Sequence, residues 1–280
     1  MNKKVVLITG VSSGIGLELA KEFEGLGFTV FGTSRNPEKL SKEYTGGITL
    51  LQLNVNNAGS RKACINQILE KAGGINILVN NAGYGQMGPL ADITDEIMHR
   101  QFETNLFGPA ALTQLVIPAM IKQKSGMIVN ISSISGVMPS AFAGAYCASK
   151  AAMNAWSDTL RIELKPFGIQ VITVQPGAIQ SNFGKTAAET LAFDKEHSFY
   201  APVADFVNKR AIISQEGATT SEEFAARLLK HLLKKNPKPI IRIGKSSTLY
   251  SLMKRCLPTT LLDSIIAGKF GLTQLRKTLQ

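Results

Sequence analysis

Short apolar runs alternate with longer amphipathic segments along most of this chain. Apolar and β-branched residues at successive positions are typical of strands buried on both faces, and such runs occupy residues 5–9, 28–33, 48–55, 75–80, 126–132, 169–174 and 239–243. Helical spacing of apolar positions fills residues 15–26, 61–71, 95–122 and 143–165 between them. Strands that alternate with helices form parallel sheets through right-handed crossovers. The pattern predicts an α/β fold, a doubly wound parallel sheet of about seven strands with helices on both faces.

The pattern weakens after the sixth predicted strand. Residues 181–220 have mixed charge and weak periodicity. Ligands of open α/β sheets bind beyond the carboxyl ends of the strands, so this stretch is predicted to be an irregular lid over a substrate. Residues 1–245 are expected to form one domain, and residues 246–280 a helical extension of it.

The C-terminal extension has apolar residues at helical spacing on both sides of Pro258, which predicts two short amphipathic helices. Such basic helices can lie on an anionic membrane surface. The alternative is that they cap the substrate cleft or a partner subunit. Their apolar residues are Leu249, Tyr250, Leu252, Met253, Cys256 and Leu257 before the proline, and Leu261, Leu262, Ile265, Ile266 and Phe270 after it.

The net charge of +11 is concentrated near the C-terminus. Residues 1–226 hold 19 Lys/Arg and 19 Asp/Glu, whereas residues 227–280 hold 12 basic residues and the single acid Asp263. This distribution argues against nucleic acid as a partner, because the body of the chain is neutral. The three cysteines are scattered without CxxC spacing, and neither they nor the three histidines indicate a metal site. With no secretion signal and no uninterrupted apolar run of membrane-spanning length, we expect a cytoplasmic protein.

The stretch "TGVSSGIG" follows the first predicted strand and opens the first predicted helix. Glycines let the backbone turn sharply and approach a pyrophosphate, while the N-terminal NH groups of the helix face the anion. The alternative interpretation is an ordinary glycine-rich turn that binds no ligand. We expect a dinucleotide site that includes Gly10, Ser12, Ser13, Gly14, Ile15 and Gly16.

Two further motifs follow predicted strands. Arg35 ends the second strand in "TSR" with no acid before it, which favours NADP over NAD unless it is simply a solvated surface arginine. "NNAG" closes the fourth strand, and its small residues would let a ligand approach the backbone of Asn81, Ala82 and Gly83, although an ordinary turn has the same composition.

Tyr146 and Lys150 are one helical turn apart on the same face of a predicted helix. A neighbouring ammonium stabilises a phenolate and lowers the pKa of the phenol, so the pair can act as a proton donor. In isolation, a surface tyrosine and lysine would be the simpler interpretation. Ser133 ends the fifth predicted strand, and Asn105 lies on the preceding long helix.

Taken together, these motifs resemble the short-chain dehydrogenase/reductases, and the resemblance covers about residues 3–245. It implies a Rossmann-like fold in which Tyr146 is the general acid or base, Ser133 binds the reacting oxygen, Lys150 holds the nicotinamide ribose, and Asn105 positions a water. It also assigns cofactor contacts to Asn54, Val55, Pro176, Gly177, Ile179 and Ser181. Asn54 stands where many members have an acid, and Ser181 where threonine is more usual.

The resemblance implies an NADP(H)-dependent oxidoreductase that acts on a carbonyl or alcohol. The opening motif, Arg35 and the tail are most similar to the hydroxysteroid, retinol and long-chain lipid dehydrogenase branch. Two alternatives are a 3-oxoacyl thioester reductase and a non-catalytic dinucleotide sensor, although a sensor would not need the proton relay. In this family, the long helices 95–123 and 143–166 would form a homodimer or homotetramer interface.

Overall fold

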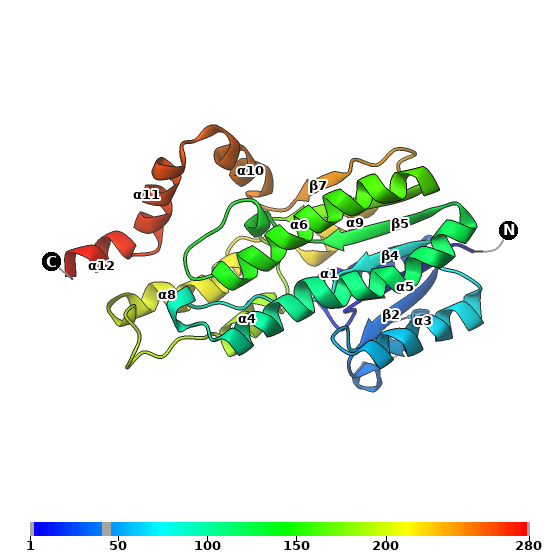
Figure 1. The fold of residues 1–280 in the computed structure, drawn as a ribbon, viewed down its shortest axis with the longest axis horizontal. Coiled ribbons are helices and arrows are strands. Elements are labelled where there is room, and N and C mark those ends of the chain that lie inside the picture. Colours follow the sequence, from blue (N-terminus) through cyan, green and yellow to red (C-terminus); the bar gives the residue numbers. More distant parts are fainter. Residues whose placement is uncertain (1–2, 41–45, 279–280) are drawn as a thin grey trace.

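The computed structural model describes residues 3–40 and 46–278. All neighbouring strands of its seven-stranded sheet are parallel, in the order β3-β2-β1-β4-β5-β6-β7 (Figure 1). This agrees with the predicted doubly wound sheet of about seven strands. The strands are β1 (Val5–Thr9), β2 (Thr29–Ser34), β3 (Thr49–Gln52), β4 (Ile77–Asn80), β5 (Gly126–Ile131), β6 (Ile169–Pro176) and β7 (Ile240–Ile243).

The helices cover both faces of the sheet and continue beyond it at the C-terminus (Figure 1). They are α1 (Gly14–Gly25), α3 (Ala58–Ala72), α4 (Asp95–Phe102), α5 (Gly108–Gln123), α6 (Gly144–Leu164), α7 (Phe183–Glu189), α8 (Ala204–Ile212), α9 (Ser221–Leu232), α10 (Ser247–Cys256), α11 (Thr259–Lys269) and α12 (Leu272–Thr278).

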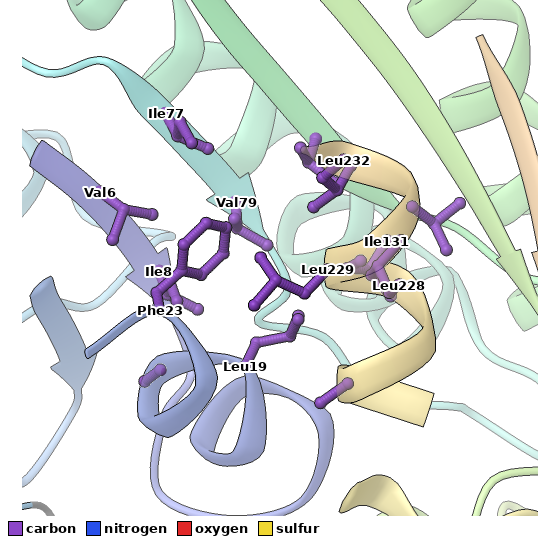
Figure 2. Close-up of a cluster of buried hydrophobic side chains, with 14 of the residues drawn as sticks. Val6, Ile8, Leu19, Phe23, Ile77, Val79, Ile131, Leu228, Leu229 and Leu232 are labelled. Atoms are coloured by element: carbon purple, nitrogen blue, oxygen red, sulfur yellow. The ribbon is translucent and has the colours of Figure 1, made fainter. Parts of the chain in front are cut away.

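Alternating strand residues supply the two halves of the core. On one face, Ile8 and Val79 pack against Phe23 of α1 and Leu228 of α9 (Figure 2). On the other face, residues such as Leu7 pack against helices α3, α5 and α6. Both faces of the central strands are therefore buried, which explains their continuous apolar sequences.

The segment predicted as one helix over residues 95–122 is helical from Asp95 to Gln123. Within it, α4 and α5 are joined by a π-helical turn, Glu103–Phe107, which the apolar pattern did not predict. By its length and by the mean hydropathy of an 18-residue window within it (1.3), the run Asp95–Gln123 could cross a membrane. Its buried residues Leu112, Val116 and Met120 instead pack into the sheet core, which accounts for much of its apolar character.

The lid segment and the tail also differ from expectation. Residues 181–220 contain helices α7 and α8, so the prediction of irregular structure is wrong. Helix α8 buries Val207 and Ala211 beside a charged residue, Arg210, which weakened the apolar pattern in the sequence. The tail forms three helices where two were predicted, because Gly271 adopts a positive φ of 72° and ends α11 before α12.

The tail packs against the lid at the end of the molecule farthest from α3 (Figure 1). Phe270 and Leu275 are buried in one cluster with Phe142, Val203 and Val207. The ring centroids of Phe142 and Phe270 are 6.3 Å apart in an edge-to-face arrangement. The lid, the tail and the loop before α6 therefore share a small core, separate from the cores on the two faces of the sheet.

Candidate functional site

A cleft of about 1710 Å³ lies at the carboxyl ends of the strands. The strand order reverses between β1 and β4, and ligands of doubly wound sheets bind at this switch point. All but two of the predicted site residues line the cleft, the exceptions being Gly16 and Asn105. Those that line it are Gly10, Ser12, Ser13, Gly14, Ile15, Arg35, Asn54, Val55, Asn81, Ala82, Gly83, Ser133, Tyr146, Lys150, Pro176, Gly177, Ile179 and Ser181.

The glycine-rich loop turns from β1 into α1 at the cleft. Gly10 and Gly14 have φ angles of +72° and +60°, a region that L-residues with side chains rarely adopt. The amide groups of Gly10 and Val11 both donate to Thr33 O at 3.0 Å, which ties the loop to β2. Ser13 precedes α1 and makes no side-chain cap, so the N-terminal turn of this helix is open to an anion.

The "NNAG" turn holds this loop in place. Asn81 Nδ2 donates to Thr9 O and Gly10 O at 2.9 and 3.0 Å. Thr9 Oγ1 accepts from the backbone amides of Asn81 and Ala82 at 3.0 and 2.9 Å. Gly16 lies behind the loop, where a Cβ atom would be 2.3 Å from Gly10 O. The motif therefore shapes the cleft through backbone contacts, a role that an ordinary turn would not have.

Two basic residues lie where β2 ends. Arg35 is exposed and lines the cleft together with Lys39, which the sequence analysis did not select. The acids among the described cleft-lining residues are Glu189 and Glu216, both of which follow β6. This part of the cleft is therefore basic, which suits an additional phosphate.

Asn54 and Val55 line the same side of the cleft just after β3. The Asn54 amide oxygen accepts the backbone amide of Asn56 at 3.1 Å, which fixes the orientation of the side chain. It retains a second lone pair, so it can still accept a hydrogen bond from a ligand.

Ser133, Tyr146 and Lys150 meet in the cleft where β5 ends and α6 begins. The Lys150 ammonium is buried, lies 6.0 Å from the centroid of the Tyr146 ring and donates to Ile131 O at 2.8 Å. Burial lowers its pKa to about 8. The neighbouring Ser133 hydroxyl accepts the backbone amide of Ser135 at 3.0 Å.

Burial raises the pKa of Tyr146 to about 12, the largest effect on this group. Hydrogen bonding with Ser133 and the positive charge of Arg210 both act in the opposite direction and lower the pKa. At neutral pH the phenol is therefore protonated, as a proton donor must be. Lys150 is not among the groups that shift this pKa, so the predicted lowering of the tyrosine pKa by Lys150 stays a prediction.

Asn105 lies in the π-helical turn between α4 and α5, directly behind the cleft. Its amide donates to Tyr84 O at 2.9 Å and to Ser149 Oγ at 3.1 Å. Ser149 in turn donates to the backbone carbonyl of Tyr146 at 2.8 Å. Such π-turns occur frequently at functional sites, and this one connects Asn105 to the tyrosine-bearing helix.

The chain leaves β6 through Pro176 and Gly177 along the cleft wall. A Cβ atom at Gly177 would lie 2.1 Å from Lys245 O, so only glycine fits between these backbones. The Ser181 amide donates to Gln215 Oε1 at 2.9 Å, which joins the two ends of the lid segment. Gln215 also lines the cleft and was not selected from the sequence.

The remainder of the cleft is lined by the lid and the tail. Arg210 of α8 lines it, as do mainly apolar residues of α10 and α11. The sequence predicts a cap as one role for the tail, but none of the tail residues is among the predicted site residues. A signal was available for Arg210, because it lies among the inward positions of an amphipathic helix. The tail residues are Ser246, Tyr250, Met253, Ile265, Ile266, Lys269 and Phe270.

Comparison with known proteins places this arrangement in a family. Residues 4–192 match the short chain dehydrogenase family. The chain is 33% identical over 268 residues to a 3-ketodihydrosphingosine reductase of Bacteroides thetaiotaomicron, covering 94% of this chain and 96% of that protein. It is also 33% identical to the uncharacterized oxidoreductase YbbO of Escherichia coli over 268 residues, covering 95% of both chains.

Among solved structures, a short-chain dehydrogenase from Streptomyces avermitilis superposes with a TM-score of 0.80 and 32% identity, covering 99% of this chain and 97% of that one. The resemblance noted from the sequence motifs is thus confirmed over nearly the whole chain. This protein belongs to the short-chain dehydrogenases, a family of oxidoreductases whose Rossmann-like fold binds a nicotinamide dinucleotide.

Proposed function

We propose that this protein is an NADP(H)-dependent oxidoreductase that transfers a hydride between nicotinamide and the carbonyl or secondary alcohol of a lipophilic substrate. One observation carries the proposal. Ser133, Tyr146 and Lys150 line the same cleft as the glycine-rich loop, so a proton donor and a dinucleotide site share one space. A non-catalytic sensor would have no need of this group.

The residues around the loop fit a dinucleotide. Gly10 and Gly14 leave the backbone bare where side chains would fill the approach to α1, and the helix N-terminus favours a pyrophosphate. The bound nicotinamide would supply or accept the hydride.

The protein's own residues would manage the proton and the reacting oxygen. In the direction of reduction, the Tyr146 phenol donates a proton to the carbonyl oxygen, which becomes the hydroxyl of the product. The Ser133 hydroxyl donates a hydrogen bond to that oxygen as negative charge develops on it. Lys150 would hold the nicotinamide ribose and stabilise the phenolate, while Asn105 would position a water that returns the proton.

A preference for NADP(H) is supported by the basic residues where β2 ends. Arg35 and Lys39 line the cleft there, and a guanidinium can bind a phosphate in a bidentate manner. A ribose-binding acid, which would favour NAD, does not precede Arg35 in "TSR".

A lipophilic substrate is supported by the far end of the cleft. Met253, Ile265, Ile266 and Phe270 of the tail provide an apolar surface there. The Bacteroides relative is named as a 3-ketodihydrosphingosine reductase, so a long-chain lipid carbonyl is our first choice ahead of a steroid or retinoid. A 3-oxoacyl thioester remains the alternative within the same chemistry.

The proposal is tested by following NADPH and NADH oxidation against long-chain ketones and aldehydes, steroid ketones, retinal, a 3-oxoacyl thioester and short aldehydes. We expect turnover with NADPH and the highest kcat/KM for a long-chain carbonyl. A preference for the thioester would support the alternative. NADPH binding without turnover of any carbonyl would support the sensor and contradict the proposal.

We further propose that the enzyme is a cytoplasmic homodimer or homotetramer. Three exposed apolar side chains support an interface in or next to the region predicted from the family: Phe107 in the π-turn before α5, Ile162 on α6, and Phe167 in the turn after α6. Peripheral membrane contact through the tail is part of the same proposal, since Leu249 and Leu252 of α10 are exposed beside Lys254 and Arg255. Light scattering measures the oligomeric state, and vesicle binding tests the membrane contact.

A further inference from the structure

Arg210 is a buried cation in the part of the cleft that is lined by the lid and the tail, called the substrate half from here on. It lies on the inward face of α8, lines the cleft, and has only 6% of its surface exposed. Within the described ranges, its one hydrogen bond runs from Nε to Ser140 Oγ at 3.0 Å, and it forms no ion pair there. Its terminal nitrogens are thus without a protein acceptor in this part of the chain. A guanidinium stays protonated in proteins, so Arg210 carries its charge in spite of burial.

The groups around Arg210 do not neutralise it. The titratable side chains that lie close enough to interact electrostatically with it are Cys147, Tyr146 and Tyr250. Burial raises the pKa of the Cys147 thiol and of the Tyr146 phenol, so both are neutral at physiological pH. A buried charge normally has a partner of opposite sign, because leaving water without one is costly.

The position of Arg210 relates it to the substrate and not to the cofactor phosphates. It acts electrostatically on the proposed proton donor Tyr146, whereas the predicted phosphate contacts are in the glycine-rich loop and at Arg35. Lys269 provides a second cation on the cleft wall, 6.0 Å from the ring centroid of Tyr250 and 5.7 Å from that of Phe270. This half of the cleft therefore combines apolar walls with cations that include Arg210 and Lys269. The acids Glu189 and Glu216 also line the cleft after β6, but neither forms an ion pair with Arg210 among the described residues.

We propose that Arg210 binds an oxyanionic group of the substrate, a carboxylate or a phosphate ester, while the carbonyl lies at Tyr146 and the apolar part of the substrate lies against the tail. A guanidinium can donate two parallel hydrogen bonds to either group. The inference rests on the proposed function and makes it narrower: the substrate is an anionic lipid carbonyl compound, and a ketone that carries a protonated amine is disfavoured.

The first experiment uses the wild-type enzyme, so no variant has to fold. It compares kcat/KM for a long-chain oxo acid with that for its methyl ester, and for a keto alcohol phosphate with that for the free keto alcohol. We expect the anionic member of one pair to be preferred at least tenfold over its neutral partner. The pair that shows this preference tells whether the subsite binds a carboxylate or a phosphate. A matched amino ketone should be the poorest substrate. Equal values within both pairs, or preference for the amine, would overturn the proposal.

The second experiment changes the cation. Arg210→Met should lower kcat/KM for the preferred anion by about 100-fold, mainly through KM, and should lower it much less for the neutral partner. Arg210→Lys should keep part of the wild-type preference in kcat/KM for the anion over its neutral partner. Lys209→Met is the matched control, because Lys209 is the exposed neighbour on the same helix and its loss changes the net charge equally. If Arg210→Met weakens the charged and neutral substrates equally, Arg210 acts through Tyr146 or the fold, and the subsite is rejected.

A binding measurement separates failure of the subsite from failure of the proposed function. In the presence of NADPH, decanoate or decyl phosphate should raise the melting temperature of the wild type more than methyl decanoate does. The difference should disappear in Arg210→Met and persist in Lys209→Met. This result would support the anion subsite even if no carbonyl were reduced, whereas turnover of neutral carbonyls without any anion effect would retain the proposed function and reject the subsite.

Discussion

The two halves of the cleft are built from different parts of the chain. In the cofactor half, backbone atoms determine the shape: Gly10 and Gly14 adopt positive φ angles, and Asn81 binds two carbonyls of the loop. In the substrate half, side chains from the lid and tail determine it, with Arg210 among apolar residues such as Ile266. Backbone constraints require particular residues at particular spacings, whereas side-chain walls can be built in many ways. The sequence could therefore select residues of the cofactor half that line one cleft, whereas Arg210 and the tail residues of the substrate half were not selected.

The largest effect is expected at the junction of the two halves. Tyr146→Phe keeps the ring that packs 5.4 Å from the Phe183 ring centroid and removes the transferable proton. We expect turnover to fall by about 10²–10⁴-fold, while the dissociation constant for NADPH stays within a few-fold. Steady-state kinetics and fluorescence titration measure the two quantities. Near-normal turnover would contradict the catalytic assignment.

The backbone design of the cofactor half is tested by Gly16→Ala. The new Cβ would lie 2.3 Å from Gly10 O and 2.4 Å from Asn81 Nδ2, so the loop must shift. We expect a loss of roughly 1–3 kcal/mol in the free energy of unfolding together with weaker NADPH binding. Gly25→Ala on the same helix is the control, because a Cβ there meets nothing within 4 Å and should leave stability unchanged or slightly higher. Equal behaviour of the two variants would show that the loop is not constrained as described.

The pH dependence of stability tests the burial of Lys150. Burial lowers the folded-state pKa from 10.5 to about 8, so between these values the unfolded chain binds more protons than the folded one. The contribution of Lys150 to the free energy of unfolding should therefore rise with pH, by on the order of 2 kcal/mol between pH 8 and pH 10. Urea unfolding should show this rise in the wild type relative to Lys150→Met. Lys165→Met, at the exposed end of α6, should follow the wild type.

A smaller effect is expected at the side chain that would select the cofactor. Arg35→Asp removes a phosphate partner and adds a repulsive charge, so the ratio of kcat/KM for NADPH to that for NADH should fall by about 10–100-fold. Lys39→Gln should shift the ratio in the same direction by a smaller factor. Wild-type enzyme that uses the two cofactors equally would show that Arg35 does not select between them.

The sheet was predictable because strands buried on both faces leave continuous apolar runs, as in "VVLIT" of β1. The π-turn around Asn105 was not, since one extra backbone residue in a helix leaves no compositional signal. Arg210 was missed because charged residues are expected on exposed faces, and its burial follows from the packing of α8 against the tail. Lys39 was missed because it lies beyond the strand end that the motif marks.

The smallest effect is expected on the outer surface of the tail, where the substrate half meets solvent. The tail is partly a cap, because Leu262, Phe270 and Leu275 are buried, yet Leu252 is 56% exposed on α10 beside Lys254 and Arg255. If this face lies on a membrane, one leucine contributes about 2 kcal/mol and each basic residue about 1 kcal/mol near anionic lipid. Leu252→Glu should then weaken co-sedimentation with phosphatidylserine vesicles at least tenfold, and salt should weaken the wild type. Leu26→Glu, at a leucine 55% exposed on the end of α1, should bind as the wild type does. If the wild-type protein stays in the supernatant at low salt, the tail does not bind the membrane and only caps the cleft.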